Sequence, residues 1–421
     1  MNIRIICIGD ELLSGDTINT NLATVGDILA QNGLSISGEQ CAPDDHDSIV
    51  NALNSADGAE VVIIIGGLGP TKDDLTRPVT AEYLHRPLHL DQTIRQHIAN
   101  YLGQRARTMP SDAIDTQAQV PEGAEILPND NGTAPGLLMI SPTTLWALLP
   151  GPPREMKPMF ENYLLPRILE REEKHLEVLT VRICGLPESR VEAGADKAIA
   201  GIPGLHFAIC LKNDCIMIRL TTPESQDSHA RLERARKALS DEFGFRLMPP
   251  DCITAAQYLG KILLAKGLVM ATAESCTGGG IAHALTAIPG SSEWFVGGMV
   301  TYANEWKHNY LGVKNKTLET YGAVSEETVH EMLNGLCIRC GVPAGVAVSG
   351  IAGPGGGTPE KPVGTVVIGA FAPGWRSVRT MHYNGLRDTV RLRSASSCIN
   401  LLIEGLLAPK DDESKGNGQI H

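Results

Sequence analysis

Short apolar runs alternate with helix-period patterns along the first 168 residues of the chain. The runs Ile3–Ile8, Leu34–Gly38 and Val61–Ile65 are short and largely apolar, which is typical of buried strands. Between them, Asn21–Asn32 and Asp47–Ala56 carry apolar residues at helical spacing. This alternation predicts a parallel sheet covered by helices, in which ligands bind beyond the carboxyl ends of the strands.

The pattern changes after a charged stretch at residues 171–175. From there to Pro249-Pro250 the chain carries enough elements for one small α+β module. The expected elements are the strand Val178–Gly185, the helix Glu188–Ile199, the strands His206–Leu211 and Cys215–Leu220, and the helix Gln226–Phe243. We therefore expect a linker module over residues 169–250.

Alternation of helices and strands returns over residues 251–408. The expected elements are the helix Ala255–Lys266, the strand Leu268–Ala273, the helix Gly279–Thr286, the strand Val296–Tyr302, the helix Glu326–Cys340, and the strands Gly345–Gly350 and Gly364–Phe371. The polar and charged residues 409–421 are typical of a disordered tail. The sequence thus predicts an α/β protein with two three-layer α/β domains, residues 1–168 and 251–408, joined by the α+β module.

Charge and hydropathy restrict the partners of the protein. The net charge is −12, which argues against nucleic acid because that affinity depends largely on Lys and Arg contacts to phosphates. A single nucleotide remains compatible, since one phosphate needs only a local site. No run of 18 apolar residues occurs, so we expect no membrane span.

The cysteines favour a cytoplasmic protein. Ten are scattered along the chain, and the pair Cys337 and Cys340 lies in a helical pattern without a second pair to complete a zinc site. Asp10 and Glu11 follow the first apolar run too closely for a signal peptide. Reduced thiols without a signal peptide are typical of the cytoplasm.

In the third domain, the strand Leu268–Ala273 ends at a turn that leads into a helix. The turn consists of Glu274, Ser275, Cys276, Thr277, Gly278, Gly279 and Gly280. Free backbone N–H groups and the helix dipole would make such a turn an anion site. An equally compatible interpretation is a helix start capped by Thr277.

A serine, a tyrosine and a lysine surround the next strand. Ser292 precedes the strand Val296–Tyr302, and Lys307 follows it. A serine becomes a nucleophile when a base removes its proton, and a lysine with a lowered pKa can be that base. The Tyr302 hydroxyl could relay the proton or position a substrate. Taken alone, however, Ser292 and Lys307 also fit an ordinary loop serine and surface lysine.

A glycine-rich turn occupies residues 350–364, between two predicted strands. Glycines such as Gly353 leave the backbone open to close contact with a ligand. Lys361 precedes Pro362, so its backbone is stiffer than that of most loop lysines. The alternative is a mobile surface loop without a ligand.

In the first domain a similar turn follows the strand Val61–Ile65. Glycine-rich backbone could hold a phosphate there, and carboxylates could hold a divalent cation that bridges to it. The turn is Gly66–Thr76, and Asp10, Glu11, Asp44 and Asp45 leave other strands at the same side, so several carboxylates are expected to converge. The alternative is that Asp and Gly occur here only as loop formers.

The turns of the third domain together resemble the C-terminal domain of CinA proteins, which also occurs alone as a nicotinamide-nucleotide amidase. The matching segments are Ala273–Gly279, Pro289–Ser292, Thr301–Lys307, Gly322–Glu326 and Gly350–Gly364. The resemblance implies hydrolysis of nicotinamide mononucleotide to nicotinate mononucleotide and ammonia, without a metal or other cofactor. It also implies a homodimer.

The same resemblance implies roles for individual residues. Ser292 would be the nucleophile and Lys307 its base, with Tyr302 assisting. The substrate would be bound by Glu274, Ser275, Thr277, Gly278, Gly279, Gly353 and Lys361. The family commonly has a serine after the tyrosine and a small residue before the lysine, where this chain has Ala303 and Trp306. Trp306 is thus expected either to shield Lys307 from water or to crowd the pocket.

The first two domains resemble the remaining parts of full-length CinA proteins. The first is similar to the molybdopterin-binding, MoaB/Mog-like fold through Gly66–Thr76, Asn131–Gly136 and Leu149–Met156. In CinA proteins that domain is associated with metal-dependent hydrolysis of ADP-ribose, which implies a divalent metal of unknown identity. The resemblance implies that the nucleotide and metal are bound by Gly67, Gly69, Thr71, Asp73, Asp74, Asp10 and Asp44. The middle module resembles a KH-like linker through Val181–Arg190, and the apolar Gly201–Gly204 turn in acidic surroundings argues against RNA binding.

Three functions remain open at this point. The main interpretation is an amidase of pyridine-nucleotide salvage. A second makes ADP-ribose pyrophosphatase the main activity, with the amidase weak or lost. A third is a non-catalytic scaffold for competence or recombination proteins, against which the Ser292, Tyr302 and Lys307 set argues, because a scaffold has no need of it.

Overall fold

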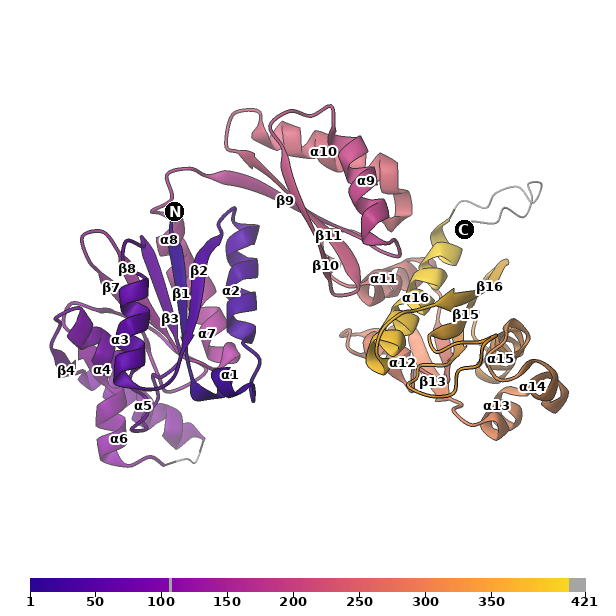
Figure 1. Cartoon of the computed structure of the whole chain (residues 1–421), viewed down its shortest axis with the longest axis horizontal. Helices are drawn as coiled ribbons and strands as arrows, with labels where there is room; N and C mark the ends of the chain where they lie inside the picture. The colour runs from indigo at the N-terminus through magenta and orange to yellow at the C-terminus, as the bar shows by residue number, and fades with distance from the viewer. Residues whose placement is uncertain (106–107, 409–421) are drawn as a thin grey trace. The chain divides into compact units, whose positions relative to one another are not determined.

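A computed structural model describes residues 1–105 and 108–408, and the chain divides into two units (Figure 1). The first unit is Met1–Val178 with Thr221–Ser228, and the second is Leu179–Leu220 with the chain from His229 onward. The predicted tail, residues 409–421, lies outside the described residues. No helix among the described residues is both long and apolar enough to cross a membrane.

The first unit is built on a six-stranded sheet. Its strands in spatial order are β2 (Ile36–Ala42), β1 (Ile3–Ile8), β3 (Val61–Ile65), β8 (Leu145–Leu149), β7 (Gly136–Ile140) and β6 (Glu125–Leu127). The strands β2, β1, β3 and β8 are parallel, and β7 is antiparallel to both of its neighbours. The predicted strands Ile3–Ile8 and Val61–Ile65 are confirmed, whereas the second strand lies later than Leu34–Gly38.

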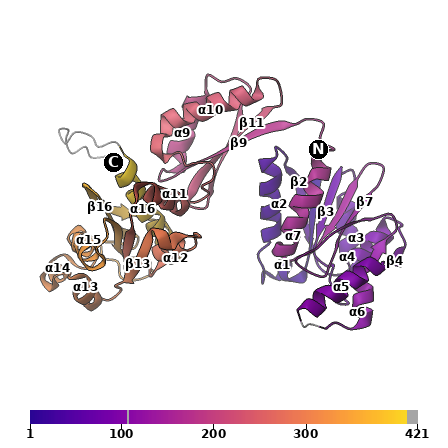
Figure 2. The ribbon, with the colours of Figure 1, turned by 180° about the vertical axis from the view of Figure 1, so that it is seen from behind.

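Helices cover both faces of this sheet. They are α1 (Asp10–Ser14), α2 (Thr20–Gln31), α3 (His46–Ser55), α4 (Thr76–Tyr83), α5 (Gln92–Gln104), α6 (Ser111–Gln117), α7 (Pro153–Met159) and α8 (Leu165–Leu169), with a π-helical turn Phe160–Leu164 between the last two. One buried cluster joins the sheet to α3, α4 and α5, and another joins it to α2, α7 and α8. The sheet is thus the middle of three layers, and α5 and α6 lie side by side (Figure 2). A short antiparallel pair, β4 (Leu88–Leu90) and β5 (Gln119–Pro121), stands apart from it.

The middle module has a three-stranded sheet and two helices. The strand order is β10 (His206–Lys212), β11 (Cys215–Pro223) and β9 (Leu176–Ile183), and the helices are α9 (Glu188–Ile199) and α10 (Ser228–Phe243). These elements were predicted with boundary errors of a few residues. Cys184, Cys215 and Met248 of this module belong to the same buried cluster as the third domain. The KH-like character of the module stays a prediction.

The third domain has a five-stranded sheet in the order β13 (Phe295–Val300), β12 (Met270–Glu274), β14 (Ala344–Gly350), β15 (Thr365–Ala372) and β16 (Trp375–His382). The first three strands are parallel, and β15 and β16 each run antiparallel to the preceding strand. The parallel pairing matters for function. It places the segments that follow β12, β13 and β14 at one edge of the sheet.

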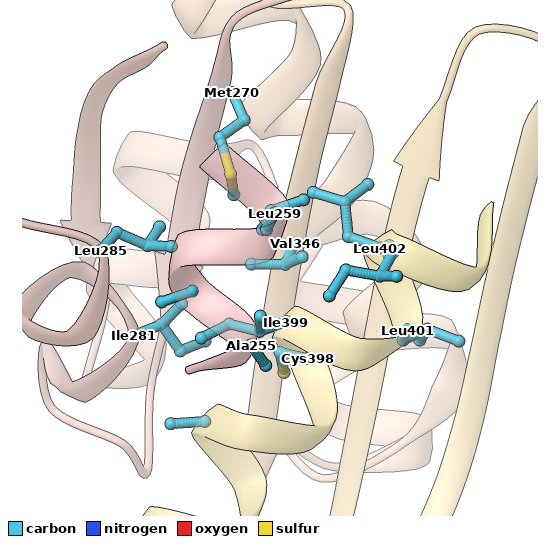
Figure 3. Close-up of a cluster of buried hydrophobic side chains, with 14 of the residues drawn as sticks. Ala255, Leu259, Met270, Ile281, Leu285, Val346, Cys398, Ile399, Leu401 and Leu402 are labelled. Atoms are coloured by element: carbon cyan, nitrogen blue, oxygen red, sulfur yellow. The ribbon is translucent and has the colours of Figure 1, made fainter. Parts of the chain in front are cut away.

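Helices lie on both faces of this sheet as well. They are α11 (Ala255–Lys266), α12 (Gly280–Thr286), α13 (Asn304–Leu311), α14 (Asn315–Tyr321), α15 (Glu326–Cys340) and α16 (Arg387–Leu407). Leu259 of α11, Ile281 of α12 and Ile399 of α16 meet in one apolar cluster (Figure 3). A second cluster joins α13 and α15 to the other face. The predicted helices Ala255–Lys266 and Glu326–Cys340 are confirmed, while no prediction covered α13, α14, β16 or α16.

Candidate functional site

The central feature of the third domain is a buried lysine that contacts a serine. Lys307 lies in α13 with 1% of its surface exposed. Its Nζ lies 3.1 Å from Ser275 Oγ, 2.9 Å from the Thr301 carbonyl oxygen and 3.0 Å from the Tyr302 carbonyl oxygen. Burial lowers the pKa of Lys307 to about 8, because the charged ammonium loses its water.

The surroundings of Lys307 Nζ suit a general base. In its neutral form the amine has two N–H donors, which the Thr301 and Tyr302 carbonyls accept, and one lone pair. The lone pair then faces Ser275 Oγ, the third group in contact with the nitrogen. Among the described residues no carboxylate forms an ion pair with Lys307 that would favour its charged form. The two carbonyls therefore direct the basic site toward the serine hydroxyl.

The turn that carries Ser275 is held by the carboxylate of Glu274, the residue before it. Glu274 is 1% exposed and ends β12. Its carboxylate accepts hydrogen bonds from the N–H groups of Gly279, Ile281 and Ala282 at 3.0, 3.1 and 2.8 Å, and from the Thr277 hydroxyl at 2.7 Å. Glu274 thus fixes the whole turn that carries Ser275.

This arrangement corrects both interpretations of the turn. The helix start is not a free anion site, because Glu274 already accepts from its N–H groups. Thr277 does not cap the helix either, since the N-cap position is Gly279 and the Thr277 hydroxyl donates to Glu274. The N–H groups of Gly278 and Gly280 donate to the carbonyls of Ser275 and Thr277. The turn is satisfied internally, as a buried polar segment requires.

The expected contact between Ser292 and Lys307 does not exist. Ser292 lies in the 3-10 turn Ser291–Glu293, is exposed, and precedes β13, whereas Lys307 follows that strand. The two residues therefore lie beyond opposite ends of β13, and a six-residue strand separates its ends by roughly 17 Å. Ser275 follows β12, which is parallel to β13, so it lies at the same edge as Lys307.

Tyr302 takes part through its backbone more than through its ring. Its carbonyl accepts from Lys307, while its side chain is 61% exposed. The hydroxyl accepts a hydrogen bond from Arg387 Nη2 at 3.2 Å, and Arg387 Nη1 donates to the Gly353 carbonyl at 2.6 Å. Arg387, which no sequence motif singled out, thereby joins the glycine-rich turn to the end of β13.

Lys361 binds the protein backbone. Its Nζ lies 2.7 Å from the carbonyl oxygens of both Tyr321 and Val324. It thus attaches the glycine-rich turn to the end of α14. Gly353 has a φ of 84°, and a Cβ there would lie 2.6 Å from Val363, so glycine is required at that position.

Trp306 packs along α13 and stays half exposed, unlike the buried Lys307. Its ring packs against Tyr310 with 4.7 Å between the ring centroids, and 51% of its surface is exposed. Ala303 is the N-cap residue of α13, and its carbonyl accepts from the Lys307 N–H at 3.2 Å. The unusual residues at these two positions leave the contacts of Lys307 Nζ in place.

A cavity of about 560 Å³ lies between α12 and α16, next to the turn that carries Ser275. Its lining consists of Thr277, Gly278, Gly279, Gly280, His283, Asp388, Arg391, Leu392 and Ala395. Arg391 Nη2 donates to the Thr277 carbonyl at 3.0 Å, which attaches α16 to the turn. No sequence motif pointed to Arg387 or Arg391. The available signal was their spacing of four residues, which places two arginines on one face of a helix.

The first domain has its own cavity, of about 390 Å³, at the carboxyl edge of the six-stranded sheet. Gly67, Gly69, Asp73 and Asp74 line it, as expected from the sequence. The Asp74 carboxylate accepts from the N–H groups of Gly69 and Thr71 at 2.7 and 2.8 Å and from the Thr71 hydroxyl at 2.5 Å. Asp74 therefore shapes this turn, with both oxygens already engaged.

Asp10 and Asp44 lie side by side at the same edge. The Asp10 N–H donates to Asp44 at 3.1 Å, and the Asp44 N–H donates to Asp10 at 3.2 Å. Burial and the nearby charges of Asp10, Glu11 and Asp74 raise the pKa of Asp44. Within the described residues, no three His, Cys, Asp or Glu side chains gather to hold a metal. The pair could still supply the one or two carboxylates that Mg²⁺ takes beside a phosphate.

Two family models match the chain. The model of the CinA C-terminal domain matches residues 253–406, and a model described as "Probable molybdopterin binding domain" matches residues 4–170. The two matches cover the domains that hold the two cavities. They agree with the resemblance seen in the motifs of the sequence.

Relatives match over nearly the full length. A competence-damage inducible protein of Clostridium beijerinckii is 38% identical over 405 residues, covering 96% of this chain and 98% of the relative. A CinA-like protein of Desulfosudis oleivorans is 39% identical over 389 residues, covering 91% and 93%. The crystal structure of competence/damage inducible protein CihA from Agrobacterium tumefaciens is 43% identical, covers 37% of this chain and 96% of that chain, and has a TM-score of 0.36.

Proposed function

Because the chain belongs to the CinA family, we propose that its third domain hydrolyses the carboxamide of nicotinamide mononucleotide to nicotinate mononucleotide and ammonia. The substrate comes from the family resemblance. The observation that carries the reaction type is the buried contact between Lys307 Nζ and Ser275 Oγ at 3.1 Å. In this proposal Ser275, in place of Ser292, is the nucleophile and Lys307 is its base.

The first half of the reaction forms an ester with the enzyme. Neutral Lys307 accepts the proton of the Ser275 hydroxyl while the oxygen attacks the carboxamide carbon. Lys307 then returns that proton to the amide nitrogen, the carbon–nitrogen bond breaks, and ammonia leaves. The two carbonyls that accept from Lys307 hold the nitrogen in place during both transfers.

The second half releases the acid by the same route. Water attacks the ester carbon while Lys307 accepts a proton from it. The bond to Ser275 Oγ breaks, and Lys307 returns the proton to the serine oxygen. Nicotinate mononucleotide is released and both residues regain their starting state, so no metal or other cofactor is needed to balance the reaction.

Burial of Lys307 also argues against a purely structural role. A buried ammonium without a carboxylate partner destabilises the fold, and a residue of this kind is typical of catalytic sites. A scaffold gains nothing from such a residue. The pair therefore favours the enzyme over the non-catalytic scaffold.

The matched variants Ser275→Ala and Ser292→Ala test the choice of nucleophile. Removing Ser275 should lower kcat on nicotinamide mononucleotide by on the order of 10³-fold or more, because no group remains to form the ester. Ser292→Ala should stay within about threefold of the unmodified enzyme, because an exposed side chain away from the site is removed. Ammonia release gives the rates, and circular dichroism checks folding. Full activity of Ser275→Ala would refute the proposal.

We propose a second, independent activity at the first domain, the hydrolysis of ADP-ribose. The favouring observation is the Asp10–Asp44 pair beside a glycine-lined cavity, where burial and neighbouring carboxylates raise the pKa of Asp44 and a divalent cation would offset both effects. Such a cation would supply charge neutralisation for a bound phosphate. A chelator and Asp44→Asn should each abolish ADP-ribose hydrolysis and leave deamidation unchanged. Equal loss of both activities would contradict this assignment.

A further inference from the structure

We propose that Arg391 and His283, on the two sides of the cavity between α12 and α16, bind the phosphate group of the amidase substrate. The inference rests on the proposed amidase function, because it assigns one end of the same substrate. It predicts that the domain distinguishes a phosphorylated nucleotide from the corresponding nucleoside. The argument combines the position of the cavity, its free donors and its charge.

The cavity begins at Thr277, two residues after the proposed nucleophile, and Ser275 itself is not part of its lining. The Gly278 N–H donates to the Ser275 carbonyl at 3.1 Å, so the cavity wall is one turn away from Ser275. Gly278 and Gly279 have φ values of 61° and 93° and present no side chains to the cavity. A ligand that reaches Ser275 can therefore lie against this stretch of backbone.

The backbone of this turn has no donors left for an anion. The N–H groups of Gly278, Gly279 and Gly280 donate to the Ser275 carbonyl, the Glu274 carboxylate and the Thr277 carbonyl. The cavity must bind an anion with side chains, and it has two that are suitable, Arg391 and His283.

Arg391 is oriented for this task. A guanidinium has five N–H donors, and the bonds to the Thr277 carbonyl and to Asp388 use two of them. The remaining donors suit a phosphate, which arginine binds through two parallel hydrogen bonds. Within the described part of the chain, the His283 imidazole has no hydrogen-bond or ion-pair partner. The free donors of both side chains can thus bind a ligand while Arg391 keeps its bond to the Thr277 carbonyl.

The charge around the cavity also favours an anion. Arg387 lies one helical turn before Arg391 on α16 and adds a second guanidinium at this edge. The opposing carboxylate is Asp388, which is 83% exposed and lies 3.2 Å from Arg391. An exposed ion pair of this kind is weak, so a phosphate dianion can displace it.

The variant Arg391→Gln tests the assignment with two substrates. It should raise KM for nicotinamide mononucleotide by about 10- to 100-fold, the equivalent of one or two lost hydrogen bonds to a charged group. Hydrolysis of nicotinamide riboside, which lacks the phosphate, should keep its kcat/KM. Arg391→Lys should recover part of the affinity. The matched control is Arg393→Gln on the same helix, whose side chain donates to the Asn384 carbonyl and does not line the cavity.

Two measurements keep the proposal testable if the variant folds poorly. In the unmodified enzyme, inorganic phosphate should compete with nicotinamide mononucleotide and leave riboside hydrolysis uninhibited. Calorimetric binding of phosphate and of the mononucleotide to Ser275→Ala reports the site without turnover, and Arg391→Gln should weaken both. If the unmodified protein binds the mononucleotide in a way that depends on Arg391 but releases no ammonia from it, the proposed function alone is overturned. Equal effects of Arg391→Gln on both substrates, or none on either, would overturn the phosphate site alone.

Discussion

Lys307 is expected to set the pH dependence of amide hydrolysis. Burial lowers its pKa from 10.5 to about 8, so about one-tenth of the molecules carry the neutral amine at pH 7. An exposed lysine would be neutral in only about one molecule in 3,000 at that pH. Because only the neutral amine can accept the serine proton, kcat/KM should rise about tenfold from pH 6 to pH 7 and level off above about pH 9.

Stability should follow the same titration. The folded state has the lower pKa, so between pH 8 and 10.5 the unfolded state binds more protons and the free energy of unfolding rises with pH. The difference between 10.5 and about 8 corresponds to about 3 kcal/mol. Lys307→Met removes the titrating group and keeps most of the side-chain volume. The unmodified protein should therefore gain about 3 kcal/mol relative to this variant across that pH window.

The assay is ammonia release from nicotinamide mononucleotide between pH 6 and 10, with urea unfolding of both proteins at pH 7 and 10.5. Lys307→Arg is the matched charge control, because its guanidinium stays protonated and should be inactive at every pH. A rate that is flat or falls between pH 6 and 8 would refute Lys307 as the base. An equal change of stability in Lys307→Met would show that burial does not lower its pKa.

Two further predictions concern the packing that holds the site. Glu274→Ala should lower the free energy of unfolding by at least about 3 kcal/mol, because three backbone N–H groups lose their acceptor; urea unfolding measures this, and a loss below about 1 kcal/mol would contradict it. Trp294→Ala should cost about 3–5 kcal/mol because the side chain is 2% exposed and packs on Gly260. The half-exposed Trp306 is the control, and its change to alanine should cost much less in the same assay.

Local pattern was enough for part of the secondary structure, but it missed the helices α4 to α8 of the first domain and α13, α14 and α16 of the third. The helices Glu188–Ile199, Ala255–Lys266 and Glu326–Cys340 were predicted with their observed bounds, since apolar residues at helical spacing mark a buried face. The parallel strands could be recognised as apolar runs, because both of their faces are covered. The antiparallel β15 could not be distinguished from a parallel strand in this way, since strand direction depends on the connection between strands. The half-exposed β16 is not an apolar run, and no prediction covered it.

The site was predicted less well than the fold, and Ser292 shows why. The motifs with Ser275, Ser292 and Lys307 follow one another in sequence, and all three residue types suit the chemistry. Which serine contacts the lysine depends on whether that serine lies at the amino or the carboxyl end of its strand. Ser275 and Lys307 follow parallel neighbouring strands, whereas Ser292 precedes one.

The sequence by itself determined the family, the alternation of strands and helices, and the turns in which the functional residues lie. These properties depend on local composition and on motifs along the chain. Only the tertiary structure decided that Lys307 is buried, that Glu274 occupies the helix start, and that Arg391 reaches the turn. Each of these depends on contacts between residues distant in sequence or on the loss of water around a side chain. A pKa or a hydrogen bond of that kind arises only when the sheet and its helices come together.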